Sequence, residues 1–560
     1  MRAVIMAGGQ GSRLKQISGE LPKPMVPVLG KPILQYQIEH LKDCGIREIT
    51  LVIGHLGEAI RSYFGDGSAF GVSISYFFED HPMGTAGALY ELKPQLSEDF
   101  LLLMGDLMLD VDFDRFAAFH RRCGGAATLF VHPNMHPYDS DVIVTDSSGM
   151  LSEYDEAHCS EAAFAARIDQ ALRTEKKEAR TEGSCQNGIG SGLSCSEKSS
   201  AAQAAPKKNG SEPDSMDVRH SLVTGVLGKK EERRAFYHNQ VNAGIYMLSP
   251  EALQSLPEPK RLSEIERELS RARDAAGGQI SEEAEKAIRK SGKIDLDRDL
   301  IRPLIDARRV YAYRSSEYVK DMGTPDRYAA VAADLKNGII SSRNLKKKQK
   351  CIFLDRDGTI NRLNGFIMRP EELELLPGAA EAIARINRSE YLCILVTNQP
   401  VVARGEVSFQ ELDCIHAKLE TLLGKEGAYI DGLYYCPHHR DRGFAGEVPE
   451  LKFSCGCRKP KPGLLRLAAA EHHIDLSASY MIGDSEQDVA AGRAAGTKTV
   501  LLSGSEESEQ AEPIKQTKPI EQTEQTKQIE QAEQSILLQE ENAPDLIFRD
   551  LLEAVGRILA

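Results

Sequence analysis

Two aspartates separated by one residue follow an apolar run in the C-terminal half of the chain. Asp355 ends the segment CIFLD, and Asp357 comes two positions later, in DRDGT. Open α/β folds bind ligands at the carboxyl ends of their strands, so both carboxylates are expected at such an edge. One carboxylate can attack phosphorus while the other transfers protons. Taken alone, the pattern is equally typical of an aspartate-rich turn.

Further polar groups follow later apolar runs in the same half. Thr397 and Asn398 end the run LCILVTN and offer a hydroxyl and an amide to a phosphoryl group. Lys459, in RKPKPG, can neutralise the charge of that group, and Asp484 ends the run YMIGD. Phosphate-binding and metal-binding groups at successive strand ends are hard to obtain by chance, so the set favours phosphoryl chemistry over a turn.

These motifs resemble those of the haloacid dehalogenase phosphatase superfamily, from Cys351 to about Leu502. The resemblance implies that Asp355 is the nucleophile, which forms an aspartyl-phosphate. It implies that Asp357 protonates the leaving oxygen and then activates water. It also implies a Mg²⁺ ion held by Asp355, the backbone carbonyl of Asp357 and Asp484, which offsets the repulsion between carboxylate and phosphate.

Three cysteines and a histidine form a second cluster in this half. Cys436 and His438 lie in CPHH, and Cys455 and Cys457 lie in CGC. Three thiolates and an imidazole on two short loops predict a tetrahedral Zn²⁺ site. We expect the zinc to be structural, because four protein ligands leave no position open for substrate. His439 is an alternative nitrogen ligand, and four unpaired surface residues are the other interpretation.

The segments DRDGTIN, TNQ, CPHH and CGCRKPKPG together resemble one subgroup of this superfamily. That subgroup contains the D-glycero-D-manno-heptose 1,7-bisphosphate 7-phosphatases and the histidinol phosphatases. The resemblance implies that Arg404 and Arg458 contact the substrate. Residues 400–402, PVV, depart from the Ser-Gly-Ile of the heptose phosphatases, so the substrate and its anomer stay open.

A glycine-rich turn follows the first apolar run of the N-terminal half. The segment IMAGGQGSR places Gly8, Gly9 and Gly11 beside Arg13, and Lys23 follows in LPKPMVP. Glycine lets backbone N–H groups approach a phosphate, and the two cations suit a triphosphate. The spacing GGxGxR differs from the GxGxxG of a dinucleotide-binding turn, so NAD is disfavoured.

Other residues of this half could bind a metal ion and a sugar. Asp106 ends an apolar run, and Asp321 lies in VKDMGTPDRY. A single aspartate at a strand end is usually a cap, but two suit a Mg²⁺ ion that bridges nucleotide and sugar phosphates. Small residues and an amide in GTAGAL and VNAGIY could admit and bind the sugar, namely Gly84, Thr85, Asn242 and Gly244.

These N-terminal motifs resemble those of the sugar-1-phosphate nucleotidyltransferases, over residues 1 to about 335 outside the inserts. The resemblance implies that a sugar 1-phosphate oxygen attacks the α-phosphorus of an NTP and releases pyrophosphate. Arg13 and Lys23 are implied to stabilise the charge, and Asp106 with Asp321 to hold Mg²⁺. Lys230, or else Lys229, is the candidate for a second sugar-phosphate lysine.

The segment HPNMHPYDSDVIV further resembles guanylyltransferases that act on D-glycero-α-D-manno-heptose 1-phosphate, although His132 and His136 could simply cap turns. The two halves then imply consecutive steps, because loss of the 7-phosphate from the bisphosphate yields the 1-phosphate. We predict a bifunctional enzyme that uses sugar phosphates and GTP to make GDP-heptose for a surface glycan. The alternatives are another sugar and base, or an N-terminal nucleotide-sugar sensor without turnover.

The elements that must position these residues are those of two α/β domains, because short apolar runs alternate with helical patterns in both halves. Residues 1–338 are expected to form a Rossmann-like, GT-A-like nucleotidyltransferase domain. After a linker at 339–350, residues 351–560 are expected to form a Rossmannoid haloacid dehalogenase-like domain with a zinc loop. Composition predicts a disordered insertion at 157–224, a charged helical insertion at 262–292 and a low-complexity insertion at 505–537.

Length and composition set the broad class. The 560 residues exceed one hydrophobic core, and 41% hydrophobic with 27% charged residues is typical of a soluble globular protein. A formal net charge of −14 disfavours nucleic acid and anionic membranes as partners. No apolar run approaches about 20 residues, no signal-peptide pattern is present and the eleven cysteines are mostly scattered, so we expect a cytoplasmic protein without disulfides. The oligomeric state is left open.

Overall fold

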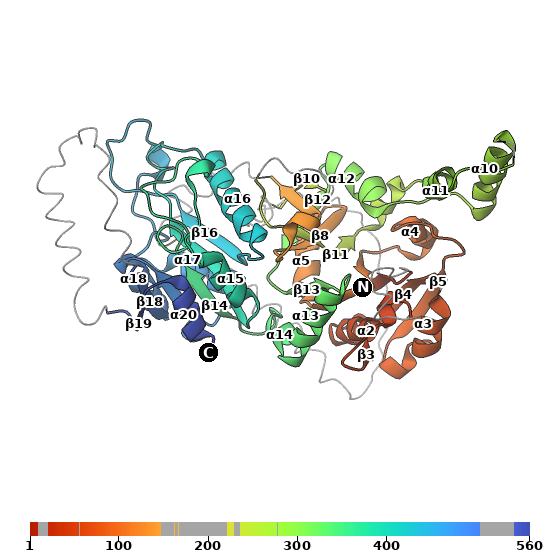
Figure 1. The fold of residues 1–560 in the computed structure, drawn as a ribbon, viewed down its shortest axis with the longest axis horizontal. Helices are drawn as coiled ribbons and strands as arrows, with labels where there is room; N and C mark the ends of the chain where they lie inside the picture. The colour runs from red at the N-terminus through yellow and green to blue at the C-terminus, as the bar shows by residue number, and fades with distance from the viewer. Residues whose placement is uncertain are drawn as a thin grey trace, which may run out of the picture.

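The computed structural model describes residues 1–8, 21–54, 56–146, 162, 166, 221–228, 236–276, 278–504 and 543–560. Over these residues the chain folds as two α/β domains side by side (Figure 1), which confirms the predicted fold class. Of the insertion predicted at 157–224, only residues 162, 166 and 221–224 are described, and the insertion predicted at 505–537 lies outside the described residues.

A mixed sheet forms the centre of the first domain. Its strands are β1 (Arg2–Met6), β4 (Glu48–Ile53), β5 (Ser73–Phe78), β6 (Phe100–Met104), β8 (Ala127–His132), β9 (Val142–Thr145), β10 (Val223–Leu227), β11 (Val241–Leu248) and β12 (Val310–Arg314). The order is β10-β9-β11-β6-β1-β4-β5, with β8 between β11 and β12. Strands β4, β1 and β6 are parallel, whereas β11 runs antiparallel to β6.

The central strands of this sheet are apolar on both faces because helices cover both. Along β1, Ile5 faces one core cluster, and its neighbour Val4 faces the other. Helix α2 packs Leu34, Ile38 and Leu41 into the first cluster. The helices are α2 (Ile33–Asp43), α3 (Gly57–Phe64), α4 (Gly87–Leu92), α5 (Phe113–Cys123), α10 (Leu262–Ala275), α11 (Glu282–Ser291) and α12 (Arg302–Asp306). Burial of each such leucine or isoleucine contributes roughly 1.5 to 3 kcal/mol.

Short elements complete the first domain. They are β2 (Pro27–Val28), β3 (Lys31–Pro32), β7 (Leu107–Asp110), β13 (Tyr318–Asp321), α13 (Pro325–Lys336) and α14 (Ile339–Ser342). Strands β13 and β7 are antiparallel, with Asp321 opposite Leu107. After α14, the buried Arg343 forms an ion pair with Asp431 at 3.2 Å and donates to the carbonyl of Tyr391 at 2.8 Å. The connection between the domains is therefore packed against the second domain.

A parallel six-stranded sheet forms the second domain. Its order is β16 (Gly432–Cys436), β15 (Tyr391–Asn398), β14 (Lys350–Leu354), β17 (Tyr480–Gly483), β18 (Lys498–Leu502) and β19 (Leu546–Phe548). Its helices are α15 (Ala379–Asn387), α16 (Phe409–Lys425), α17 (Gly463–Glu471), α18 (Glu486–Ala495) and α20 (Leu551–Ile558). The chain proceeds outward from β14 to β16 and then returns to β17 beside β14. This reversal opens a crevice at the carboxyl ends of β14 and β17, where such sheets bind ligands.

Every helix among the described residues is too short or too polar to cross a lipid bilayer.

Candidate active sites and metal centre

Asp355 lies at the carboxyl end of β14, in the crevice of the second sheet. The Lys459 ammonium donates to Asp355 Oδ1 at 2.6 Å and to the carbonyl of Val396 at 2.9 Å, and it also pairs with Asp488. Burial raises the pKa of Asp355 to about 7, although Lys459 opposes the rise. Burial lowers the pKa of Lys459, but Asp355 and Asp488 outweigh it and raise that pKa to about 12. The lysine is therefore charged beside the predicted nucleophile.

Three carboxylates converge in this crevice. Oxygens of Asp355, Asp484 and Asp488 lie within 4.8 Å of one another, a donor set that suits a hard divalent cation such as Mg²⁺. Gly358 is required here, because a Cβ on it would lie 1.9 Å from Asp484 Oδ2. Asp488, which the sequence places one helical turn after Asp484 in GDSEQD, joins the two carboxylates that the resemblance implies as ligands.

Asp357 is fixed by three side-chain donors. Arg356 donates to its two oxygens at 3.0 and 2.9 Å, Asn361 donates to Oδ1 at 2.9 Å, and Gln399 donates to Oδ2 at 2.9 Å. The predicted metal contact of Asp357 through its backbone carbonyl stays a prediction. Sequence reasoning missed the three donors, although Arg356 and Asn361 lie in DRDGTIN and Gln399 lies in TNQ. Such a fixed carboxylate suits a group that gives and takes a proton.

The polar residues that end β15 are joined to the same site. Thr397 Oγ1 accepts a hydrogen bond from Gln399 at 3.0 Å. The Asn398 side chain accepts from the Lys459 backbone N–H at 3.0 Å and donates to the Lys459 carbonyl at 3.1 Å. The structure thus brings Thr397, Asn398 and Lys459 together, as the sequence predicts.

Cys436, His438, Cys455 and Cys457 form a compact, buried cluster whose ligand atoms lie within 4.8 Å of one another. His438 Nδ1 lies 3.4 Å from the sulfur of Cys436 and 3.3 Å from that of Cys457. The cluster could hold a metal ion in tetrahedral coordination. The alternative ligand, His439, instead contacts Arg404 at 3.2 Å.

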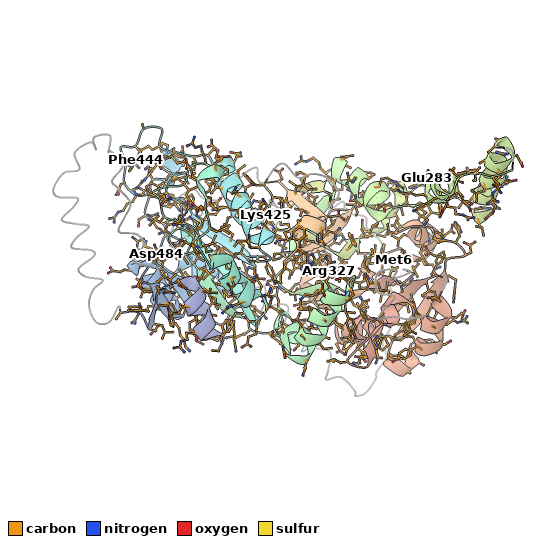
Figure 2. The ribbon with its side chains drawn as sticks, viewed as in Figure 1. Met6, Glu283, Arg327, Lys425, Phe444 and Asp484 are labelled. Carbon is orange, nitrogen blue, oxygen red and sulfur yellow. The ribbon has the colours of Figure 1, made fainter. Side chains whose placement is uncertain are left out.

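The two predicted substrate arginines flank this cluster. The Arg404 guanidinium lies over the rings of Phe366 and Phe444, at 4.5 and 4.7 Å from their centroids. Arg458 donates to the carbonyl of His438 at 3.3 Å. Figure 2 shows Phe444 and Asp484 on the side of the second domain that faces away from the first domain. Arg327 and Met6 lie in the first domain.

A cavity of about 1180 Å³ in the first domain continues to the surface of the second, and its lining includes Lys23, Asp106, Asn242 and Asp321. The Lys23 ammonium pairs with the Asp106 carboxylate. The backbone N–H of Met322 donates to the carbonyl of Asp106 at 3.2 Å, which places Asp321 beside Asp106. The structure therefore brings together one predicted cation, both predicted magnesium ligands and the predicted sugar amide.

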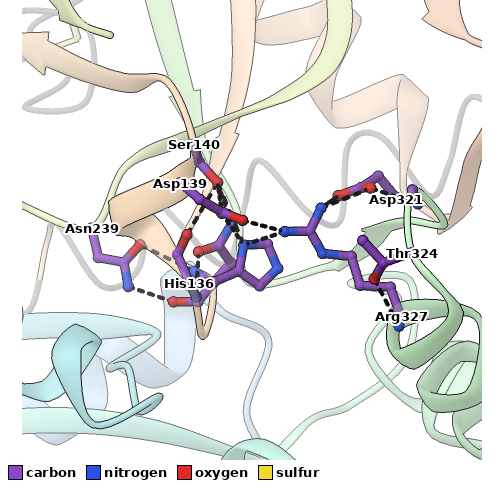
Figure 3. Close-up of polar contacts among 9 residues, drawn as sticks. His136, Asp139, Ser140, Asn239, Asp321, Thr324 and Arg327 are labelled. Atoms are coloured by element: carbon purple, nitrogen blue, oxygen red, sulfur yellow. Dashed lines mark hydrogen bonds and ion pairs between the residues drawn. The ribbon is translucent and has the colours of Figure 1, made fainter. Parts of the chain in front are cut away.

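Arg327 holds the predicted magnesium ligand Asp321 (Figure 3). Its Nη1 donates to both Asp321 oxygens, at 3.0 and 2.9 Å, and its Nη2 donates to Asp139 at 2.8 Å and lies 3.1 Å from His136 Nδ1. Burial raises the pKa of Asp321, but Arg327, the Gly323 N–H and Lys23 together outweigh it, so the net shift is downward. Sequence reasoning missed Arg327, which lies in the quoted segment VKDMGTPDRY.

Several predicted transferase residues lie elsewhere or outside the described residues. Among the described lining residues of the cavity, Gly84, Thr85 and Gly244 are absent. A Cβ on Gly84 would lie 2.3 Å from the carbonyl oxygen of Ile294, so this turn approaches the backbone there closely. Thr85 Oγ1 accepts from the Leu296 N–H at 2.7 Å. Both residues therefore pack the turn against residues 294–296. The residues outside the described part of the chain are Gly9, Gly11, Arg13, Lys229 and Lys230.

Family models match both domains. The model described as nucleotidyl transferase matches residues 2–162. The model described as haloacid dehalogenase-like hydrolase matches residues 279–496, and a related hydrolase-like model matches residues 456–554. The first match covers β1, β6 and the Lys23–Asp106 pair, and the other two together cover the phosphatase crevice and the cysteine cluster.

Curated relatives match the second domain over most of their own length. The D-glycero-beta-D-manno-heptose-1,7-bisphosphate 7-phosphatase of Salmonella typhi is 36% identical over 170 residues, which are 30% of this chain and 88% of that protein. The protein of the same name from Pasteurella multocida is 39% identical over 154 residues, which are 28% of this chain and 81% of that protein.

Solved structures resemble each domain separately. The D,D-heptose 1.7-bisphosphate phosphatase of B. bronchiseptica, complexed with magnesium and phosphate, is 29% identical, with 38% of this chain and 98% of that chain covered and a TM-score of 0.28. HddC from Yersinia pseudotuberculosis, complexed with GMP-PN, is 16% identical, with 60% and 99% covered and a TM-score of 0.35. Both scores are below 0.5, so the fold assignment stands on the strand order given above.

Proposed function

The chain belongs to the haloacid dehalogenase-like hydrolases related to heptose bisphosphate phosphatases and also carries a nucleotidyl transferase domain, and we propose that this bifunctional enzyme performs consecutive steps on one sugar. The second domain removes the 7-phosphate of D-glycero-D-manno-heptose 1,7-bisphosphate. The first domain transfers a guanylyl group from GTP to the resulting heptose 1-phosphate, which gives GDP-heptose and pyrophosphate. The observation that carries the proposal is that one chain contains both a domain related to heptose bisphosphate phosphatases and the Lys23–Asp106–Asp321 site.

In the phosphatase step, a carboxylate oxygen of Asp355 attacks the 7-phosphorus and the bond from phosphorus to the sugar oxygen breaks. Asp357, held by Arg356 and Gln399, gives its proton to that leaving oxygen. Asp357 then takes a proton from water, whose oxygen attacks phosphorus and releases inorganic phosphate and free Asp355. A Mg²⁺ ion held by Asp355 and Asp484 would supply charge neutralisation, together with Lys459.

In the transferase step, a phosphate oxygen of the sugar 1-phosphate attacks the α-phosphorus of the nucleotide, and the bond to the pyrophosphate leaving group breaks. Lys23 lies in the cavity where its charge can stabilise the phosphates. Asp106 and Asp321 would hold Mg²⁺, which supplies charge neutralisation when bound. Asn242 lines the same cavity, and its amide is fixed by a hydrogen bond to Tyr246 at 2.9 Å, so it is positioned to orient the sugar.

Glu79 supports guanine as the base. It follows β5 and lies against the first glycine of the phosphate turn, because a Cβ on Gly8 would be 3.0 Å from Glu79 Oε2. Glu79 Oε1 is buried and has no hydrogen-bond partner among the described residues. Burial raises the pKa of Glu79 to about 7, so the ionised form predominates above that pH. In that form the carboxylate only accepts hydrogen bonds, and guanine is the base whose pairing edge presents two adjacent donors, N1–H and the N2 amine.

The choice of base can be tested directly. With heptose 1-phosphate and each NTP separately, we expect pyrophosphate release with GTP to exceed that with ATP, UTP or CTP. Glu79→Gln should lower the preference for GTP over ATP about tenfold, because one acceptor is replaced by a donor. Glu91→Gln, an exposed change on α4, is the matched control. Release with UTP or CTP alone would refute the guanylyl assignment.

We propose that the cysteine cluster binds a structural Zn²⁺ ion, because all four donors are protein side chains of the types that zinc prefers. The expected content is one zinc per chain, measured by elemental analysis. Cys455→Ser should lose most of this zinc and unfold at a lower temperature, because the two loops lose their common anchor. Cys414→Ser, at an exposed position on α16, should keep both the zinc and the unfolding temperature. Full zinc content in the Cys455 variant would contradict the ligand assignment.

A further inference from the structure

Helix α16 of the phosphatase domain carries part of the first domain. The first-domain segment that meets it, residues 236–239, is called the docking segment and leads directly into β11. The backbone N–H of Tyr237 donates to Thr421 Oγ1 at 3.0 Å, and Thr421 Oγ1 lies 3.2 Å from the Tyr237 carbonyl oxygen. The Lys418 ammonium lies 4.6 Å from the ring centroid of Phe236. One face of α16 is therefore a seat for the docking segment.

The strongest contact in this seat is His238, which lies between two carboxylates of α16. Its Nδ1 is 2.7 Å from Glu420 Oε1, and its Nε2 is 3.1 Å from Asp413 Oδ1. The second oxygen of Glu420 accepts from the backbone N–H of Asn239 at 2.7 Å. Burial opposes the charge on His238, but Glu420 and Asp413 outweigh it and raise its pKa to about 10. Glu420 thus binds two successive residues of the docking segment.

Asn239 carries this contact to a loop of the transferase site, residues 133–140, called the acceptor loop. The Asn239 side chain accepts from the Asn134 N–H at 3.1 Å and donates to the Asn134 carbonyl at 2.7 Å. Asn134 Oδ1 in turn accepts from the His136 N–H at 3.0 Å. Figure 3 shows Asn239 on one side of His136 and Arg327 on the other.

The acceptor loop also packs directly against the phosphatase domain. A Cβ on Gly424, near the end of α16, would lie 2.7 Å from Pro137 Cγ. Met135 packs against the hydrophobic core of the second domain. On its opposite side the loop presents His136 and Asp139 to Arg327, which holds the predicted magnesium ligand Asp321. The loop lines the cavity and is bounded by one domain on each side.

We propose that α16 of the phosphatase domain positions the acceptor loop, and that this loop forms the wall of the transferase cavity that binds the sugar. Glu420 is the positioning residue, and it acts through His238 and Asn239. This inference rests on the proposed function of the first domain. Its physical basis is that the acceptor loop belongs to no long helix or strand. The geometry of such a loop is only as exact as the contacts that hold it. The phosphatase domain therefore has a second role, which is independent of its own chemistry.

Glu420→Gln tests the proposal in the full-length enzyme. The amide carries no negative charge opposite His238, and it offers one acceptor oxygen where the Glu420 carboxylate offers two. Asp413 still contacts the histidine. We expect the KM for the sugar 1-phosphate to rise about tenfold, because the acceptor loop is misplaced. The KM for GTP and the phosphatase kcat/KM should change less than twofold. Glu426→Gln, the same change at the exposed end of α16, should leave all three values unchanged.

A double-mutant cycle separates positioning from general destabilisation. His238→Gln should also raise the sugar KM, and the variant with both substitutions should resemble either single variant, because the two residues act through one contact. If the wild type transfers guanylyl and Glu420→Gln has the same sugar KM as Glu426→Gln, the positioning role is wrong. Fully additive effects in the cycle would also overturn it. If the wild type itself transfers no nucleotide, the proposed function fails instead.

Discussion

Asp355→Asn is expected to lower the phosphatase rate constant by at least about 10⁴-fold, because the amide cannot form the aspartyl-phosphate. The substitution should not unfold the domain, since Lys459 keeps its contacts with Asp488 and with the Val396 carbonyl. Release of inorganic phosphate from the heptose bisphosphate measures the effect. Nucleotidyl transfer to supplied heptose 1-phosphate should remain at the wild-type rate, because Asp355 makes no contact with the transferase cavity.

Glu371→Gln provides the matched control for this variant. It is the same loss of a carboxylate at an exposed position of the same domain. It should retain the wild-type phosphate release and zinc content. Phosphate release above about one per cent of wild type in the Asp355 variant would exclude a nucleophilic role.

The nucleophile could be predicted from sequence because its motif is local. Asp355, Asp357 and Gly358 are consecutive or nearly so, and the strand before them is apolar and buried from Cys351 to Leu354. The strand ends at Asn398 and Asp484 follow the same rule. A parallel sheet brings these ends to one edge whatever the length of the chain between them. The order of strands therefore supplies the long-range information that the motifs lack.

The missed residues depend on contacts that no local pattern encodes. Arg327 and Asp139 are 188 positions apart, and His238 and Glu420 are 182 positions apart. Each is an ordinary charged residue in its own segment. Residues 339–350 show the same limit, because the basic stretch is typical of a solvated linker, whereas the Arg343 side chain is buried against Asp431. Burial of a single arginine depends on a partner carboxylate that only the fold can supply.

The phosphatase site and the transferase cavity lie next to opposite edges of the sheet of the second domain. Asp355 follows β14, at the carboxyl edge. The second-domain residues that reach the transferase cavity lie at the amino edge: Asn387 and Arg388 before β15, and Tyr429 and Asp431 before β16. Helix α16 follows β15 and precedes the parallel strand β16, so it runs from the carboxyl edge to the amino edge. Substitutions of the metal-binding carboxylates should consequently affect one reaction each. Substitutions in the seat of α16 should affect the transferase reaction, although this helix belongs to the phosphatase domain.

Asp106→Asn is expected to lower the rate of nucleotidyl transfer by at least about 10³-fold while phosphate release is unchanged. Asp106 bears this effect because Arg327 donates to both oxygens of its neighbour Asp321, whereas Asp106 pairs with the single Lys23 ammonium inside the cavity. The amide would weaken Mg²⁺ binding and remove the ion pair with the Lys23 ammonium. Pyrophosphate release from GTP and heptose 1-phosphate measures the loss.

Asp43→Asn, an exposed change at the end of α2, is the matched control and should transfer nucleotide at the wild-type rate. Raising the Mg²⁺ concentration should partly restore the Asp106 variant, because the remaining Asp321 can still bind the ion weakly. A variant defective only in folding would not respond to the ion in this way. Transfer within tenfold of wild type would mean that Asp106 does not bind the metal, and that the predicted pair of carboxylates is not the magnesium site of this domain.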